Sequence, residues 1–165
     1  MVTRRVVADA GPLIIWGRLG RLDLLRTVCG EIWVPKLVER EAVNDPRRPG
    51  AAAILTAFTS GILLHPSPKL EEADAAPFPT LGAGESAAIR LAMHLQCPVV
   101  MDEKRGRSIA KAQHVAVIGT LGILLAAKRQ GNVDQIKPII EQMGQMNYFV
   151  SPMLYAAVLK ASGER

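Results

Sequence analysis

The stretch RRVVADAGPL, residues 4–13, gives the clearest indication of the fold class. Residues 4–8 form a short, partly β-branched run that ends at Asp9, which is typical of a buried strand that stops at a loop. A helical spacing of apolar residues then begins at Gly11 and runs, with one break, to Val28. A short apolar strand that leads directly into a helix predicts a parallel sheet with helices on both faces.

The same alternation of strand and helix recurs to the end of the chain. Further strands are predicted at residues 32–34, 62–64, 99–101, 115–118 and 148–150. Further helices are predicted through residues 37–41 and at 51–58, 85–95, 105–113, 121–130, 134–146 and 152–159, the last with Ser151 as its N-cap. The proline-rich residues 66–80 between them are predicted to be a surface loop.

Length and composition narrow the class of protein. The 165 residues suit one domain, and an apolar content of 49% fills an aliphatic core, which excludes wholesale disorder. No apolar run is long enough to span a membrane, and the run after Arg4 and Arg5 stops at Asp9, so we expect no signal peptide either. The two cysteines give neither a disulfide framework nor metal-ligand spacing, which points to the reducing cytoplasm.

Four acids are expected at the edge of the sheet where the carboxyl ends of its parallel strands meet. Asp9 and Asp102 directly follow two of the predicted strands. On a helical wheel of about 100° per residue, Glu85 lies within roughly 40° of the apolar stripe of its helix. Glu41 also lies on the apolar side of its helix, whereas Glu39 lies further round.

Such a cluster needs a partner that offsets its repulsion. Two carboxylates ~4 Å apart repel by about 4 kcal/mol at an effective dielectric near 20. Protons or a hard cation would neutralise them, and ligands that are all oxygen suit Mg²⁺ or Mn²⁺. A cation held in this way activates water and stabilises charge on a phosphodiester. The acids therefore predict metal-dependent hydrolysis of nucleic acid.

Each acid also has a plainer explanation. Asp9 and Asp102 could cap the helices that follow them, Glu85 could stabilise a helix N-terminus by its charge, and Glu41 could be half-exposed. We favour a shared site, because otherwise all four acids would stand at one edge of the sheet by chance.

The basic residues agree with a polyanionic substrate. The chain has 20 basic and 15 acidic residues, and with the four acids set aside the rest carries a net charge of +9. Lys104, Arg105 and Arg107 follow Asp102 and are expected either to bind phosphate, Arg107 in a bidentate grip, or to form a solvated helix start. Thr120 is expected to cap the helix that it opens, and its hydroxyl could also lie at the acidic edge.

Four segments together resemble the PIN-domain family, and look closest to its small prokaryotic branch related to VapC-type toxins. They are VVADAGPLI (6–14), WVPKLVEREAV (33–43), LGAGESAAIRLAMHLQCPVVMDEKRGRSIA (81–110) and VAVIGTLGILLAAKRQG (115–131). The resemblance implies a single domain, residues 1–165, with a core at 4–131 and a C-terminal helical extension at 132–165. It also implies a three-layer α/β/α sandwich with a central parallel sheet.

The resemblance also assigns roles to the acids. It implies Mg²⁺- or Mn²⁺-dependent cleavage of RNA by Asp9, Glu41, Glu85 and Asp102, with Glu103 as a supplementary acid. The metal would be held mainly by Asp9 and Asp102, with Glu85 as a further ligand and Glu41 orienting the metal or its waters. Toxins of this family are usually homodimers inhibited by a small antitoxin protein.

Three hypotheses follow for the function. The first is an endoribonuclease that serves as the toxin of a toxin–antitoxin pair. The second is an inactive PIN-like module that binds RNA or a protein partner; it draws on Ala10 and Val100, which stand where the family often has hydroxyl side chains. The third, a phosphoacceptor receiver domain, fits poorly, because the first strand ends in a single acid and the third predicted strand leads to His65.

Overall fold

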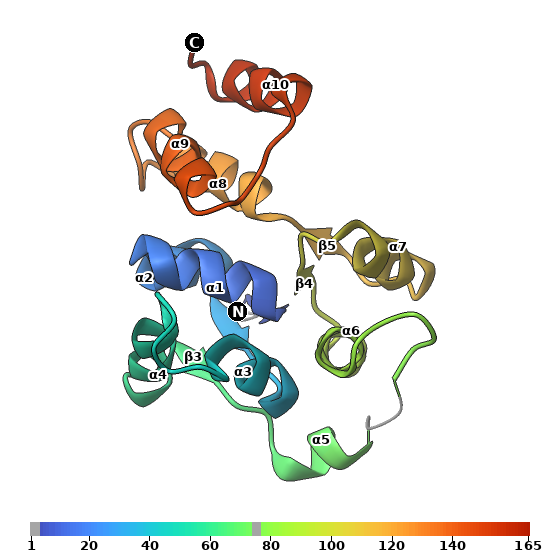
Figure 1. Ribbon diagram of the computed structural model, residues 1–165. Helices are drawn as coiled ribbons and strands as arrows, with labels where there is room; N and C mark the ends of the chain where they lie inside the picture. The colour runs from blue at the N-terminus through green and yellow to red at the C-terminus, as the bar shows by residue number, and fades with distance from the viewer. Residues whose placement is uncertain (1–3, 74–76) are drawn as a thin grey trace.

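The computed structural model describes residues 4–73 and 77–165, and in these ranges it contains one five-stranded sheet (Figure 1). All pairs of neighbouring strands are parallel, and their order across the sheet is β3-β2-β1-β4-β5. The strands are β1 (Arg5–Ala8), β2 (Glu31–Trp33), β3 (Leu63–Leu64), β4 (Val99–Val100) and β5 (Val117–Ile118). The predicted parallel sheet is confirmed, with the opening strand of the chain at its centre.

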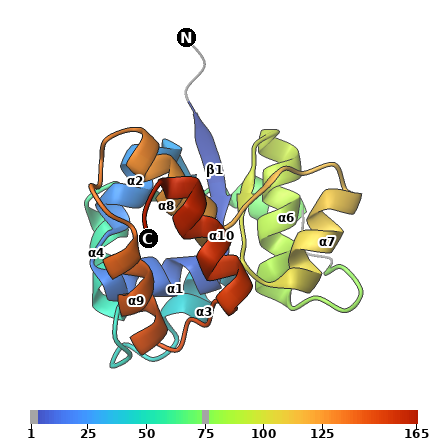
Figure 2. The same cartoon turned by 90° about the horizontal axis from the view of Figure 1, so that it is seen from above.

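Helices cover both faces of this sheet. In β1, Val6, Val7 and Ala8 are all buried, although successive side chains of a strand point to opposite faces. Figure 2 shows β1 between α2 on one side and α6 on the other. The predicted three-layer α/β/α sandwich is therefore confirmed.

Ten helices are found in the described ranges, and none of them has the length and apolar character needed to cross a membrane. The helices of the first half are α1 (Ala10–Leu19), α2 (Leu22–Cys29), α3 (Lys36–Val43), α4 (Ala51–Thr59) and α5 (Pro68–Ala73). Those of the second half are α6 (Ala83–Leu95), α7 (Lys104–Ala112), α8 (Thr120–Arg129), α9 (Lys137–Gln145) and α10 (Pro152–Ser162).

Two local predictions are wrong. Residues 148–150 form no strand; their alternation of partly buried and exposed side chains imitates one, but they connect α9 to α10. The predicted loop at 66–80 contains α5, because Pro68 stands in the first turn of that helix, where a missing N–H is tolerated. Residues 74–76 of the predicted loop lie outside the described residues.

The register of β1 and β4 positions the candidate site. Ala8 lies beside Val100, and the Asp9 N–H donates to the Val100 carbonyl over 3.0 Å. The hydrogen-bond ladder thus extends to the residue that ends β1. Asp102 comes two residues after Val100, at the same carboxyl edge of the sheet. The sheet therefore brings two acids together that are far apart in the sequence.

The C-terminal helices pack onto this core. Ile136, just before α9, is fully buried. Glu164 joins three elements, since its carboxylate accepts hydrogen bonds from Lys128 in α8 and from the N–H groups of Ile136 and Lys137 at the start of α9. Burial alone would raise the pKa of Glu164, but these hydrogen bonds and one from Ser162 outweigh it and lower the pKa to about 2.

Candidate active site

Asp9 directly follows β1 and is the N-cap residue of α1, yet its side chain makes no capping hydrogen bond within this described segment. The residue is 6% exposed, and its Oδ1 has no hydrogen-bond partner among the described residues. Burial raises the pKa of Asp9, although the Ala10 N–H opposes this shift. The negative charges of Glu85, Glu41 and Asp102 add to the effect of burial, and together these influences raise the pKa of Asp9 to about 7. Helix capping therefore does not explain Asp9, which faces three other acids.

Glu41 reaches the same region from α3. It is exposed, but its Oε1 accepts a hydrogen bond from the N–H of Gly84 at the start of α6 over 3.1 Å. A Cβ atom at position 84 would overlap with this carboxylate, so only glycine permits the approach. Glu39, two residues earlier in α3, pairs with His65 instead.

Glu85 stands in the first turn of α6, next to Gly84. Partial burial raises the pKa of Glu85, and the charges of Glu103 and Glu41 raise it further, while Arg105 lowers it. A Cβ atom at Gly106 of α7 would lie 3.3 Å from Glu85 Oε2, so the start of α7 packs closely against this carboxylate. Glu85 is thus placed between the acids of α3 and those that follow β4.

Asp102 follows β4 and is held by Thr120 through both carboxylate oxygens. The Thr120 N–H donates to Oδ1 over 2.8 Å, and the Thr120 hydroxyl donates to Oδ2 over 2.7 Å. Thr120 is the first residue of α8 and Gly119 is the N-cap, so the expectation that Thr120 caps this helix is wrong. Its hydroxyl is turned to Asp102 instead. Thr120 thereby supplies a hydroxyl group to the acidic edge, which Ala10 and Val100 cannot do.

Glu103 has a structural role. Its carboxylate accepts the N–H of Gly106 over 2.8 Å and caps α7. The helix after β4 is therefore capped by Glu103, and the carboxylate of Asp102 is used at the start of α8. Glu103 nevertheless acts on the acidic edge, because its charge raises the pKa of Glu85.

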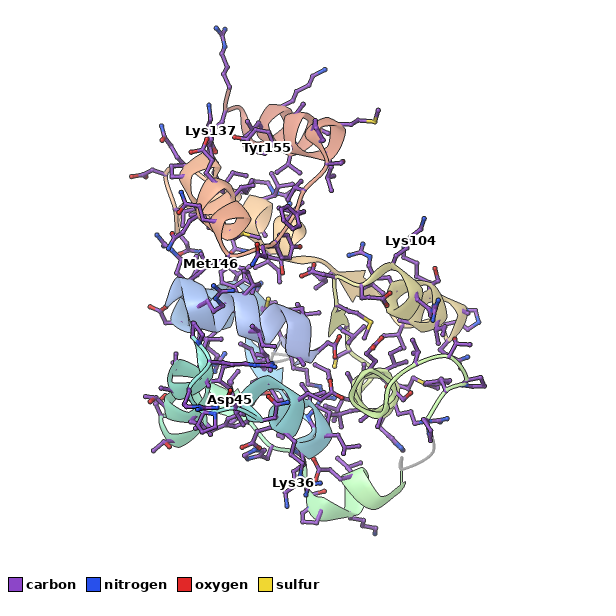
Figure 3. All side chains as sticks on the ribbon, in the orientation of Figure 1. Lys36, Asp45, Lys104, Lys137, Met146 and Tyr155 are labelled. Atoms are coloured by element: carbon purple, nitrogen blue, oxygen red, sulfur yellow. The ribbon has the colours of Figure 1, made fainter. Side chains whose placement is uncertain are left out.

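The predicted phosphate-binding residues lie along the first turns of α7. Lys104 and Arg105 are exposed, and Figure 3 shows Lys104 on the edge of α7 nearest to α10. Arg107 is partly buried, and its Nη1 donates to the Met101 carbonyl over 3.2 Å. A Cβ atom at Gly119 would lie 2.6 Å from this Nη1. The guanidinium therefore packs against the backbone of residue 119, where a side chain would clash with it.

Tyr148 is the site residue that the sequence did not reveal. It belongs to the segment between α9 and α10, and its hydroxyl lies beside the Asp102 carboxylate. Burial raises the pKa of Tyr148, and Asp102 raises it further through its charge and a hydrogen bond with the phenol. A groove of about 520 Å³ is lined by Asp102, Lys104, Arg107, Tyr148 and Leu154. The one available signal was an aromatic side chain in a chain that is only 4% aromatic.

Asp9, Glu41, Glu85 and Asp102, which we call the acidic cluster, fit a hard divalent cation in their chemistry. All the donors are carboxylate oxygens, and the buried Oδ1 of Asp9 lacks a partner within the described part of the chain. No three acidic, histidine or cysteine side chains of that part are already close enough to form a complete ligand set. Asp9 and Asp102 would hold a cation from the sheet edge, and Glu85 and Glu41 would join from α6 and α3.

Comparison with known proteins covers nearly the whole chain. A family model described as a PIN domain matches residues 5–164, a range that includes the acidic cluster and both C-terminal helices. A search among curated proteins gave no match.

Proposed function

The chain belongs to the PIN-domain family, whose members are generally nucleases, and we propose that it is a metal-dependent endoribonuclease. The buried Oδ1 of Asp9, which has no hydrogen-bond partner in the part of the chain that the structure describes, carries this proposal. Leaving such an oxygen without a partner costs roughly 1–3 kcal/mol, and the neighbouring acids increase that cost. A divalent cation would offset the cost, because it gives the acidic cluster a common partner.

The residues of the acidic cluster have different tasks in this proposal. Bound Mg²⁺ or Mn²⁺ supplies the positive charge that activates water and stabilises a phosphodiester. Asp9 and Asp102 belong to the rigid edge of the sheet, and Thr120 fixes the orientation of the Asp102 carboxylate. Glu85, whose pKa is raised by burial and by two neighbouring acids, is suited to accept a proton from the attacking water.

The charge of the chain supports RNA as the substrate. Its net charge is +5 although the acidic cluster concentrates negative charge at one edge. Lys104 and Arg105 are exposed beside that edge and are assigned to phosphate contacts. Arg107 uses one N–H for the Met101 carbonyl, which leaves donors of its guanidinium for a phosphate oxygen.

The proposal extends to the biological setting. The enzyme would be the toxin of a toxin–antitoxin pair, would act in the cytoplasm as a homodimer, and would be inhibited by a small antitoxin protein. The free thiols of Cys29 and Cys97 agree with a reducing compartment. Expression of the chain alone should arrest growth, and co-expression of the protein encoded by a small neighbouring reading frame should restore it.

An RNA degradation assay tests the catalytic part. The purified chain should cut RNA with Mg²⁺ or Mn²⁺ and stop cutting when EDTA is added. Asp9→Asn should lower the rate by about 100-fold or more, because the loss of a metal ligand removes several kcal/mol of stabilisation. Asp23→Asn, the same change at an exposed position of α2, is the control and should cut as the parent does. Equal rates for the two variants would refute the assignment.

Binding without cleavage is the second candidate function, and one observation favours it. Both carboxylate oxygens of Asp102, which a metal ion would need, already accept hydrogen bonds from Thr120. Tyr148 also lies against the same carboxylate. Calorimetric titration with Mn²⁺, run beside the degradation assay, separates the two functions. Metal binding without any RNA cleavage would favour a module that only recognises its partner.

A further inference from the structure

The segment that follows α9 brings one more side chain to the acidic cluster. We propose that Tyr148 in this segment is a positioning residue, which holds the carboxylate of Asp102 in one orientation for a divalent cation. The inference rests on the proposed metal-dependent function and adds to it a task for the C-terminal helices. In this role Tyr148 acts through Asp102 and contacts neither the cation nor RNA itself.

A Schellman motif at the end of α9 fixes the path of the chain to Tyr148. Asn147 has a φ of 65°, in the left-handed region that asparagine tolerates, and its N–H donates to the Gly144 carbonyl over 3.2 Å. The Tyr148 N–H donates to the Met143 carbonyl over 3.1 Å. Met143 is fully buried, so the turn is anchored in the core. The backbone of Tyr148 is therefore held in place independently of its side chain.

The same turn is tied to the first helix of the chain. The Arg18 Nη1 in α1 donates to the Met146 carbonyl over 3.0 Å, and Figure 3 shows Met146 beside α1. Asp9 is the N-cap residue of the same helix. One helix thus carries Asp9 of the acidic cluster at its start and holds the turn that leads to Tyr148 at its end.

The phenol of Tyr148 adds a third donor to the carboxylate of Asp102. Thr120 donates to Oδ1 through its N–H and to Oδ2 through its hydroxyl. The Tyr148 hydroxyl lies in the same groove and forms a hydrogen bond with the same carboxylate, in which the phenol donates because an ionised carboxylate only accepts. A carboxylate has about four lone-pair positions, so three donors leave one for a cation. Asp102 is therefore held by its neighbours and can still bind a metal.

The two acids at the sheet edge are thus prepared for a cation in different ways. Asp9 presents a buried Oδ1 that has no hydrogen-bond partner among the described residues, whereas Asp102 presents a carboxylate whose orientation is already set. Groups that orient a metal ligand typically change metal affinity by about 10- to 100-fold when they are removed. The contribution of Tyr148 should therefore appear in the affinity for the metal.

The test uses the full-length Tyr148→Phe protein, which keeps the ring and loses the hydroxyl. Calorimetric titration should show an affinity for Mn²⁺ that is about tenfold lower than in the parent. At subsaturating Mn²⁺, kcat for RNA cleavage should fall while KM for RNA stays the same, because fewer molecules hold the metal. At saturating Mn²⁺ the rate should return to within about twofold of the parent, since mass action refills the site.

Tyr155→Phe is the matched control. The Tyr155 hydroxyl donates to Glu141 Oε1 over 3.3 Å, so this change also removes a bond from a phenol to a carboxylate, but outside the acidic cluster. It should leave Mn²⁺ affinity, kcat and KM unchanged. Circular dichroism and thermal unfolding of both variants monitor the fold.

Three results would overturn the positioning role. Parent-like Mn²⁺ affinity in Tyr148→Phe would show that Asp102 does not need the phenol. A higher affinity would show that the phenol competes with the metal for the carboxylate. A loss of rate that saturating Mn²⁺ does not restore, or a raised KM for RNA, would mean that Tyr148 acts on the substrate or on the fold instead.

The same measurements separate this inference from the nuclease proposal. If the parent binds Mn²⁺ but cuts no RNA, and Tyr148→Phe still weakens Mn²⁺ binding, the positioning role stands and the nuclease assignment fails. If the parent cuts RNA and Tyr148→Phe binds Mn²⁺ as the parent does, the nuclease assignment stands and the positioning role fails. A parent that binds no Mn²⁺ would overturn both.

Discussion

The two ends of the sheet each carry a hollow, and they differ in how their polar groups are satisfied. At the amino end, a cavity of about 820 Å³ is lined by residues that include Arg5, Cys29 and Cys97. The Arg5 guanidinium there donates to the Leu95 carbonyl over 2.7 Å. Burial raises the pKa of Cys97 and raises that of Cys29 to about 11, so both thiols stay protonated and unreactive.

At the carboxyl end the groove is smaller, but it is lined by Asp102, whose charge acts on the buried Asp9, and the Oδ1 of Asp9 lacks a hydrogen-bond partner among the described residues. Unsatisfied charge, and not volume, marks the end of the sheet where chemistry can occur. The larger cavity has more volume, but burial raises the pKa of its two thiols and so makes them less reactive. The smaller groove is lined by Asp102, which belongs to a cluster of acids whose negative charges repel one another.

Metal and pH should have the largest effect on stability, and this effect should arise at the carboxyl end of the sheet. Because the pKa of Asp9 is about 7 in the fold against the ordinary value of 3.8, the stability contributed by its proton is fully present below pH 3.8. It is lost as the pH rises through about 7. At pH 8, Mn²⁺ at 100 times its Kd should raise Tm by about 5–10 °C, since such binding contributes about 2.7 kcal/mol.

Thermal unfolding at pH 5 and pH 8, with EDTA or with Mn²⁺, measures this effect. The gain from Mn²⁺ should be smaller at pH 5, where protons compete with the metal for Asp9. Asp9→Asn should remove the pH trend and most of the gain. A gain from Mn²⁺ that is equally large in Asp9→Asn would place the metal away from the acidic cluster.

Thr120→Val should have the next largest effect. Valine keeps the backbone N–H that donates to Asp102 Oδ1 but removes the hydroxyl that donates to Oδ2. We expect about a tenfold loss in both RNA cleavage and Mn²⁺ affinity, and a loss in stability of about 1–2 kcal/mol. Thr27→Val, at an exposed position of α2, is the control. Parent-like Mn²⁺ affinity in Thr120→Val would show that the Asp102 carboxylate needs no orienting hydroxyl.

Gly84→Ala should reduce cleavage by several-fold. The added methyl group would displace the Glu41 carboxylate from the Gly84 N–H, while Asp9 and Asp102 stay in place. Gly144→Ala in α9 is the matched control, because a Cβ atom there meets nothing within 4 Å. That control should keep full activity and gain about 0.5–1 kcal/mol in stability. Cleavage rates and unfolding curves of both variants measure these effects, and equal activities would remove Glu41 from the site.

Glu31→Gln should have the smallest effect. Glu31 lines the large cavity at the amino end, far along the sheet from the acidic cluster. We expect the rate of RNA cleavage and the response to Mn²⁺ to stay within about twofold of the parent. Substitutions of exposed or partly exposed residues away from a functional site usually change the properties of a protein little. A clear loss of activity in this assay would mean that the amino end takes part in the function after all.

Much of the fold could be predicted because its signals are local. The strand that precedes Asp9, the helix that contains Glu85, and the N-cap of α10, where the Ser151 hydroxyl accepts the Leu154 N–H, all follow from neighbouring residues. Residues 148–150 were wrongly predicted to be a strand, since a short run of aromatic and β-branched side chains occurs in connections as well as in strands.

The amino-acid sequence alone was enough to predict most of the strands and helices along the chain, the parallel sheet, and the acids that follow β1 and β4. It could do so because apolar periodicity and strand ends are properties of short segments. The contacts of Thr120 and Tyr148 with Asp102, and of Glu41 with Gly84, became visible only in the folded protein. These contacts join segments that lie 18 to 46 residues apart in the chain. No local pattern encodes them, because they arise from the packing of complete helices on the sheet.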